Sequence, residues 1–229
     1  MKILSIDSSV MACSVAIISD EKIYAVKEEH TPSKQAEKLV PMIEELLKEK
    51  DLSYDDINLL AVTVGPGSFT GVRIGMSAVK GLSLATDLPI LGITSLETIS
   101  WQAALSNKDS TLILAVINAM RGQVYHQLFS FTGEYLKEKT EAGICELEDL
   151  SSLLKEKNIL IATNCAALIS SVLGERNEKI YEATPHATYA GLLAARKFQL
   201  YGTEKLHSLE PLYIRPPDAK KPKSNFHAS

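Results

Sequence analysis

The chain has 229 residues, of which 45% are hydrophobic and 23% charged, and this composition excludes intrinsic disorder over most of its length. No apolar run reaches the roughly 20 residues of a membrane span and Met1 leads directly into a strand-like segment, so we expect a soluble, cytoplasmic protein of one large or two small domains. Its net charge of −4 makes the chain as a whole a poor nucleic-acid surface, because phosphate binding needs lysine and arginine.

The N-terminal segment predicts a small sheet followed by a helix. Three short apolar runs predict a meander of strands over residues 2–7, 12–18 and 22–28. Residues 33–49 carry apolar side chains at steps of three and four, which predicts an amphipathic helix capped by Ser33. Pro41 lies inside this pattern, and we expect it to kink the helix or to mark a tight turn.

A buried strand, a glycine-rich loop and a helix come next. Residues 57–64 are almost continuously apolar, which is typical of a strand buried on both faces. The sequence Gly-Pro-Gly-Ser-Phe-Thr-Gly follows at 65–71 and leads into a helix that runs to about residue 86. A short strand at 91–93 and a helix at 95–106 complete the first half.

The second half repeats this broad order of elements. Residues 107–110 are short and polar, and they are the best candidate for a boundary between two α/β subdomains. We expect strands at 111–118, 123–131, 136–138, 159–163 and 180–182, and helices at 147–156, 165–173 and 186–201, the last closed by Gly202. The expected organisation is a first subdomain over 1–106, a second over 107–214 and a tail over 215–229.

The glycine-rich loop is the strongest local signal for chemistry. It lies between a buried strand and a helix, where backbone N–H groups can hold an anion, and Arg73 can pair with a phosphate or a carboxylate. It has neither the lysine of a Walker motif nor the glycine spacing of a nucleophile elbow. A tight turn into a packed helix explains the loop equally well. The candidates for a position near a phosphate or nucleotide are Asp7, Ser8, Ser9, Gly65, Gly67, Ser68, Thr70 and Arg73.

The helix after this loop carries a stripe of small residues. Gly71, Gly75, Ala78, Gly81 and Ala85 follow one another at steps of three and four, which places them along one helix face. A glycine destabilises a helix by roughly 1 kcal/mol relative to alanine, so several of them indicate that another backbone approaches closely. That backbone belongs either to the protein's own core or to another chain.

Signatures of a metal site are weak. Asp7 ends the first strand, where it can meet a phosphate or a metal-bound water, although aspartate at this place also caps turns. The five histidines include no H-x-x-x-H pair and the three cysteines no C-x-x-C pair, which disfavours a local metal site, a zinc finger and a disulfide framework. Residues 118–122 fit either the wall of a cleft or, more simply, a hairpin turn at Arg121 and Gly122.

The C-terminal tail is basic. Residues 215–229 have a net charge of +3, which leaves −7 for the rest of the chain. The tail is either a flexible terminus or a local contact to RNA. The candidate RNA contacts are Arg215, Lys220, Lys221 and Lys223.

Four segments together resemble a known family. They are MKILSIDSS at 1–9, ACSVA at 12–16, GPGSFTGVRIG at 65–75 and EPLYIR at 210–215. These segments resemble TsaB, a family of bacterial accessory proteins in the synthesis of tRNA threonylcarbamoyladenosine. The resemblance implies two actin/Hsp70-like subdomains of mixed sheet flanked by helices.

The resemblance also implies a function. The chain would be a non-catalytic scaffold or activator of the threonylcarbamoyl transferase that modifies the adenosine beside the anticodon. In the family the transferase is the paralogue TsaD, whose H-x-x-x-H metal motif is absent here, since His30 is followed by Lys34. Asn118 stands where the family usually has an aspartate. The alternative is an autonomous actin-like ATPase or a metallopeptidase-like hydrolase.

The partners that the resemblance implies are other proteins and tRNA, without a membrane. They are TsaD in a heterodimer, the ATPase subunit TsaE, a second copy when the chain is alone, and tRNA through the complex. No intrinsic cofactor or metal is implied, and ATP or ADP is implied only at the interface with the catalytic subunit.

Family members pair through helices of the first subdomain, which transfers here to the helices at 33–49 and 71–86. The residues expected at this interface are Leu39, Ile43 and the stripe of small residues. Gly75→Leu is then expected to abolish pairing with the catalytic subunit without unfolding the protein.

Overall fold

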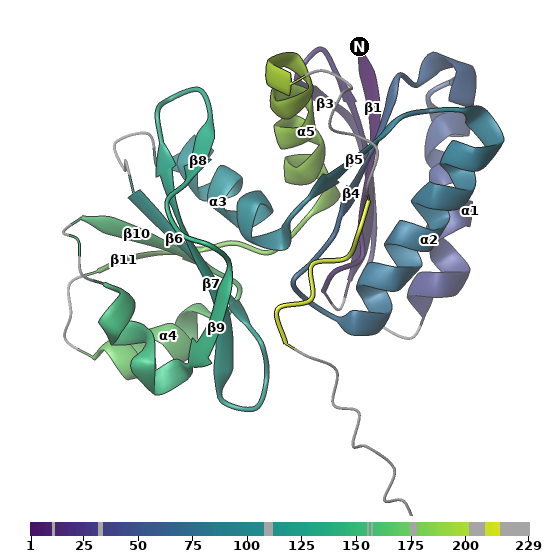
Figure 1. The fold of residues 1–229 in the computed structure, drawn as a ribbon. Coiled ribbons are helices and arrows are strands. Elements are labelled where there is room, and N and C mark those ends of the chain that lie inside the picture. The colour runs from purple at the N-terminus through teal and green to yellow at the C-terminus, as the bar shows by residue number, and fades with distance from the viewer. Residues whose placement is uncertain are drawn as a thin grey trace, which may run out of the picture.

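The computed structural model describes residues 1–10, 12–31, 34–107, 112–154, 156, 158–174, 178–201 and 209–215. These residues form two sheets with helices on their outer faces and two further helices between them (Figure 1). Strands and helices alternate along the chain, so the predicted α/β class is confirmed.

The first sheet has five strands in the order β3-β2-β1-β4-β5. The first three strands pair antiparallel, as the predicted meander requires, whereas β1, β4 and β5 run parallel. Every residue of β4 is buried, as its continuous apolar sequence predicts. The strands are β1 (Lys2–Asp7), β2 (Cys13–Ser19), β3 (Lys22–Glu29), β4 (Leu59–Thr63) and β5 (Ile90–Ile93).

The second sheet has six strands and repeats the same topology. Its order is β11-β10-β6-β7-β8, and β9 pairs with β7 in addition. The central strand again has an antiparallel neighbour on one side and two parallel strands on the other. The strands are β6 (Leu112–Asn118), β7 (Gln123–Phe131), β8 (Leu136–Glu138), β9 (Gly143–Glu146), β10 (Ile159–Thr163) and β11 (Lys179–Glu182).

Helices complete the layers. α1 (Gln35–Glu49) and α2 (Phe69–Thr86) lie side by side on the outer face of the first sheet (Figure 1). α4 (Ala166–Leu173) and the 3₁₀ helix η3 (Leu147–Leu153) cover the outer face of the second sheet. α3 (Ser95–Ser106) and α5 (Ala187–Tyr201) lie between the sheets, and one apolar cluster joins them to both.

The two central helices are exchanged between the halves of the chain. α3 comes from the first half but packs on β6 and β7 of the second sheet, whereas α5 comes from the second half but packs on β1 and β2. A Cβ on Gly191 of α5 would lie 2.6 Å from Ile18 and 2.9 Å from Ser5, so the glycine permits this close approach. The division into 1–106 and 107–214 is therefore corrected, because the chain crosses between the sheets after β5 and again after β11.

Most predicted helices and strands are present, with local corrections. The helix expected at 147–156 is the shorter 3₁₀ helix η3, whose central serines favour turns over α-helix. The strand β9 and a 3₁₀ turn, η2 (Tyr54–Asp56), were not predicted. α1 continues through Pro41, an exposed position at which water can bind the carbonyl group that the missing N–H leaves unpaired. Ser33, Gly202 and most of the predicted 107–110 boundary lie outside the described residues.

Candidate functional site

The predicted phosphate-binding residues come together at the carboxyl ends of β1 and β4. These strands are parallel neighbours, with Ile6 paired to Val62, so Asp7 and the glycine-rich loop leave the sheet at the same edge. Ser68 caps α2, because its hydroxyl oxygen accepts a hydrogen bond from the Gly71 N–H at 3.2 Å. Asp7, Ser8 and the glycine-rich loop therefore lie close together at this edge of the sheet.

Asp7 is buried and held by groups of its own chain. Its Oδ1 accepts hydrogen bonds from the Ser9 N–H at 3.3 Å, from the Ser9 hydroxyl at 2.7 Å and from the Thr63 hydroxyl. Burial raises the pKa of Asp7 above its usual 3.8, although these hydrogen bonds act in the opposite direction. The residue is 1% exposed, so its carboxyl group fixes the end of the strand and does not face solvent.

Ser8 and Ser9 are covered by the glycine-rich loop. A Cβ on Gly67 would lie 2.2 Å from the Ser9 carbonyl oxygen, and one on Gly71 would lie 2.0 Å from that of Ser8. The Ser68 N–H donates to the Ser9 carbonyl at 2.7 Å, and the Ser8 hydroxyl donates to the Gly71 carbonyl at 2.7 Å. These contacts favour the interpretation of the loop as a tight turn packed against β1 over its interpretation as a phosphate cradle.

Arg73 is exposed and lies over one of two aromatic rings that pack against each other. Its guanidinium carbon is 3.7 Å from the centre of the Phe69 ring and 5.9 Å from that of Tyr213. Its Nε donates a hydrogen bond to the Tyr213 hydroxyl at 2.9 Å, and the two ring centres are 5.2 Å apart. The sequence analysis missed both rings. Phe69 lies one helical turn before Arg73, so the i, i+4 spacing could have indicated that contact, whereas Tyr213 follows Arg73 by 140 residues and no local pattern links them.

The segment 209–215 (yellow in Figure 1) lies along the first lobe and reaches the second lobe through Arg215. The Leu212 N–H donates to the Val64 carbonyl at 2.8 Å beyond β4. At the other lobe, the Arg215 guanidinium donates to Oε1 of Gln123 at 2.6 Å. The buried Gly65 belongs to this contact, since a Cβ there would lie 3.1 Å from the Leu212 carbonyl oxygen. Residues 209–215 are called the strap below.

The matching turn of the second sheet is also closed by internal hydrogen bonds. The Asn118 N–H donates to the side-chain oxygen of Asn164 at 3.0 Å, and Oδ1 of Asn118 accepts from the Met120 N–H at 2.8 Å. Arg121 and Gly122 have φ values of +59° and +76°, which a tight hairpin turn requires. The hairpin prediction is confirmed. The uncharged amide of Asn118 makes the side-chain hydrogen bond of this turn, so the turn does not need a carboxylate.

The stripe of small residues on α2 does not form a single surface. Gly71 and Gly75 are buried against Ser8, whose Oγ would lie 2.5 Å from a Cβ on Gly75. Gly81 and Ala85 are exposed, and no atom lies within 4 Å of a Cβ placed on Gly81. The assignment of Gly71 and Gly75 to a partner interface is therefore corrected. Gly75→Leu would disturb the protein's own core and does not test pairing.

The predicted interface residues of α1 are also part of the core. Leu39 is 1% exposed and Ile43 is fully buried, because both pack toward the first sheet. Their assignment to a partner interface is corrected. The exposed side of α1 carries Val40, at 40% exposure, among charged side chains.

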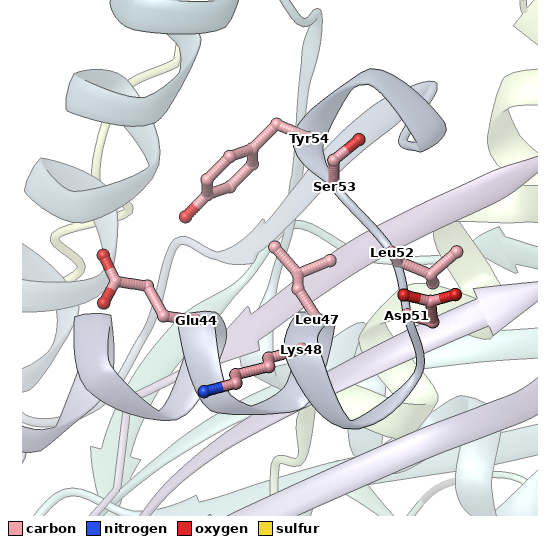
Figure 2. Close-up of a pocket in the computed structure, with 7 residues that line it drawn as sticks. All are labelled: Glu44, Leu47, Lys48, Asp51, Leu52, Ser53 and Tyr54. Atoms are coloured by element: carbon pink, nitrogen blue, oxygen red, sulfur yellow. The ribbon is translucent and has the colours of Figure 1, made fainter.

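Two surface hollows lie away from this region. A groove of about 360 Å³ lies at the C-terminal end of α1, where Tyr54 stands over Leu47 between Glu44 and Lys48 (Figure 2). A hollow of about 640 Å³ lies between α3, α5 and β8, and its wall includes the ion pair of Glu97 with Lys197.

His186 has structural partners on both sides of its ring. His186 precedes α5 and lies between the Thr188 N–H, 3.1 Å from its Nδ1, and Glu28, 2.7 Å from its Nε2. Within the described part of the chain, no three His, Cys, Asp or Glu side chains are arranged to hold a metal ion. Over the same residues, no helix combines the length and apolar character needed to cross a membrane. The candidate RNA contacts Lys220, Lys221 and Lys223 lie outside them.

Comparison with protein families gives an extensive match. The family model described as TsaD, tRNA N6-adenosine threonylcarbamoyltransferase, matches residues 21–220. The chain is 31% identical to the "tRNA threonylcarbamoyladenosine biosynthesis protein TsaB" of Bacillus subtilis over 230 residues, which cover 96% of each chain. It is 39% identical to the protein of that name from Escherichia coli over 155 residues, which cover 68% of this chain and 63% of that protein.

Solved structures show the same fold. YeaZ from Pseudomonas aeruginosa superimposes with a TM-score of 0.80 and 24% identity, covering 93% of this chain and 99% of that one. The activator of the 2-hydroxyisocaproyl-CoA dehydratase from Clostridium difficile gives a TM-score of 0.52 at 12% identity over 91% of this chain and 100% of that one. The two repeated α/β lobes therefore have the actin/Hsp70-like fold.

Proposed function

The chain belongs to the TsaB family, and we propose that it takes part in tRNA threonylcarbamoyladenosine biosynthesis as a non-catalytic partner of the transferase TsaD. Its relatives are named for that pathway, and the family model that matches it is named for the transferase. The finer part of the proposal, a scaffold or activator that acts by docking, rests on the site and on the surface of α2.

The region at the ends of β1 and β4 supports a role without chemistry of its own. Asp7 and Ser8 make their hydrogen bonds within the chain, and the loop that leads into α2 lies against them. This arrangement argues against the alternative of an autonomous ATPase or hydrolase, which needs groups that face a substrate. We propose that any ATP or ADP held by the complex lies at the subunit interface, away from the ends of β1 and β4.

The exposed face of α2 carries the docking proposal. Leu84 is 86% exposed, and the adjacent Gly81 leaves room for a partner side chain. Four exposed residues follow one another at helical spacing on this face: Arg73, Ser77, Lys80 and Leu84. Of these, Arg73 also contacts an aromatic ring. A large apolar side chain beside a glycine and one turn from a lysine is an arrangement that a protein partner covers well. We call this face, from Phe69 to Leu84, the α2 outer face.

Leu84→Asp tests the docking proposal. We expect it to weaken binding to TsaD by roughly 2 kcal/mol or more, because it places a charge where an apolar contact forms. Binding is measured by titration calorimetry and size-exclusion chromatography, and tRNA modification is measured with and without this chain. The matched control is Leu168→Asp on α4, a second exposed leucine at 38% exposure on the other lobe.

The outcomes separate cleanly. Loss of binding and of stimulated modification with Leu84→Asp, but not with Leu168→Asp, supports docking through α2. Equal binding by both variants and the unchanged chain would contradict it. Threonylcarbamoyl transfer or nucleotide hydrolysis by the purified chain alone would contradict the non-catalytic role. The same chromatography, run on the chain alone and with TsaE, tests the proposed homodimer and the proposed contact to the ATPase subunit.

A further inference from the structure

We propose that Arg73, stacked on Phe69 and hydrogen-bonded to Tyr213, is the anchor on the α2 outer face that receives a carboxylate of the partner protein. This inference rests on the proposed function, since it names the chemistry of the contact that docking would use. The partner side chain is an aspartate or glutamate presented by the transferase chain.

The geometry of Arg73 favours a prearranged contact. One face of the guanidinium lies over the Phe69 ring at 3.7 Å from the ring centre, and Nε donates to the Tyr213 hydroxyl at 2.9 Å. These contacts already hold the long side chain in one conformation. Binding a partner therefore costs less rotamer entropy than it would for a free arginine. Phe69 and Tyr213 remain 50% and 43% exposed, so the cluster lies at the surface.

The terminal nitrogens of Arg73 have no acceptor among the described residues. Two other arginines are paired: Arg196 forms an ion pair with Glu21 at 2.7 Å, and Arg215 binds Gln123. A guanidinium whose Nε is occupied still presents both terminal nitrogens, which match the two oxygens of a carboxylate. Arg73 is therefore a fixed cation that lacks its anion within the described chain.

The surroundings favour a protein carboxylate over a phosphate of RNA. α2 contains Arg73 and Lys80 and no acidic residue, so its outer face is cationic within a body of net charge −7. That negative body repels a polyanion such as RNA, whereas one carboxylate on a partner helix meets the cations alone. Leu84 continues the face about three turns beyond Arg73, which suits a protein surface with an apolar contact and an acidic residue.

The test compares variants of Arg73 in titrations of the full chain with TsaD. Arg73→Glu is expected to weaken binding about tenfold or more, because it sets two carboxylates against each other. Arg73→Lys keeps the positive charge but loses the two parallel N–H donors of the guanidinium. Tyr213→Phe keeps the ring but loses the hydroxyl that accepts from Nε. Both variants are expected to lose less binding affinity than Arg73→Glu. Lys137→Glu on β8 makes the same change of charge on the other lobe and is expected to bind normally.

A charge exchange identifies the partner group. Exposed aspartates and glutamates of TsaD are changed to arginine one at a time and titrated against Arg73→Glu. If one TsaD variant restores binding to Arg73→Glu but not to Lys80→Glu, this result supports a direct pair between Arg73 and the changed carboxylate. Thermal melting of each variant alone checks that it folds, which the exposed position of Arg73 leads us to expect.

Other results overturn the inference. If Leu84→Asp abolishes binding while Arg73→Glu binds normally, docking through α2 stands and the role of Arg73 falls. If Arg73→Glu binds TsaD normally but weakens the binding of tRNA to the assembled complex, the ligand is a phosphate and the inference is wrong. If the unchanged chain does not bind TsaD, the proposed function and this inference fall together.

Discussion

At the scale of single residues, side chains that the sequence offers as ligands have structural roles, and Asp7 is the example. Asp7 lies at the end of β1, a position where a carboxylate can bind a phosphate or a metal-bound water. It is buried instead, and it accepts three hydrogen bonds from its own chain. Burial is the larger effect on its pKa, which lies above the usual value. The carboxyl group therefore affects stability in a way that depends on pH.

Asp7→Asn is expected to remove this pH dependence. Because the pKa of Asp7 is raised in the folded chain, the folded state binds a proton that the unfolded state has released above about pH 4. The stability of the unchanged chain relative to Asp7→Asn should then fall as pH rises through the raised pKa, by at most about 1.4 kcal/mol per pH unit. Denaturant unfolding from about pH 4 to about pH 8 measures it, and a constant difference would contradict the buried acid.

At the scale of elements, α2 shows that one spacing pattern can contain two roles. Gly71 and Gly75 face inward and let α2 approach Ser8, whereas Gly81 lies on the α2 outer face with open space around it. Glycine is required at the first two positions by close contact. At the third, no contact within the described chain requires it.

Alanine substitutions distinguish these roles. Gly71→Ala is expected to destabilise the chain by about 1–3 kcal/mol, because a Cβ would lie 2.0 Å from the Ser8 carbonyl oxygen. Gly81→Ala is expected to stabilise it by about 0.5–1 kcal/mol, since alanine favours the helix and meets nothing. Denaturant unfolding measures both, and a destabilising Gly81→Ala would show that this position has a packing role too.

At the scale of the whole molecule, the two lobes are tied together at several places. α3 and α5 are exchanged between the sheets and share one apolar cluster with both. The strap adds a tie from Leu212 at the first lobe to Arg215 at the second. These links hold the two repeated lobes in one arrangement.

Arg215→Ala tests the strap. We expect a loss of about 1.5–3 kcal/mol in the free energy of unfolding, because the partly buried hydrogen bond to Gln123 involves a charged donor. The control is Arg196→Ala, which removes a surface ion pair with Glu21 and should cost about 0–1 kcal/mol. Equal losses in the two variants would mean that the strap contributes no more than a surface contact.

The sequence by itself determined the local structure. Short apolar runs located the meander of β1 to β3, the continuous run at 57–64 located the buried β4, and three- and four-residue spacing located α1 and α2. The segments that resemble the TsaB family identified the fold and the family. These features could be predicted because side-chain period and turn chemistry are properties of neighbouring residues.

Only the tertiary structure decided what the candidate residues face. Leu39 and Gly71 face the chain's own core. α3 and α5 each pack on the sheet of the other half of the chain, and Tyr213 lies beside Arg73. Each of these outcomes depends on which segments distant in sequence come into contact. Burial and close approach are properties of that contact, so spacing along the chain cannot distinguish a residue that faces a partner from one that faces the core.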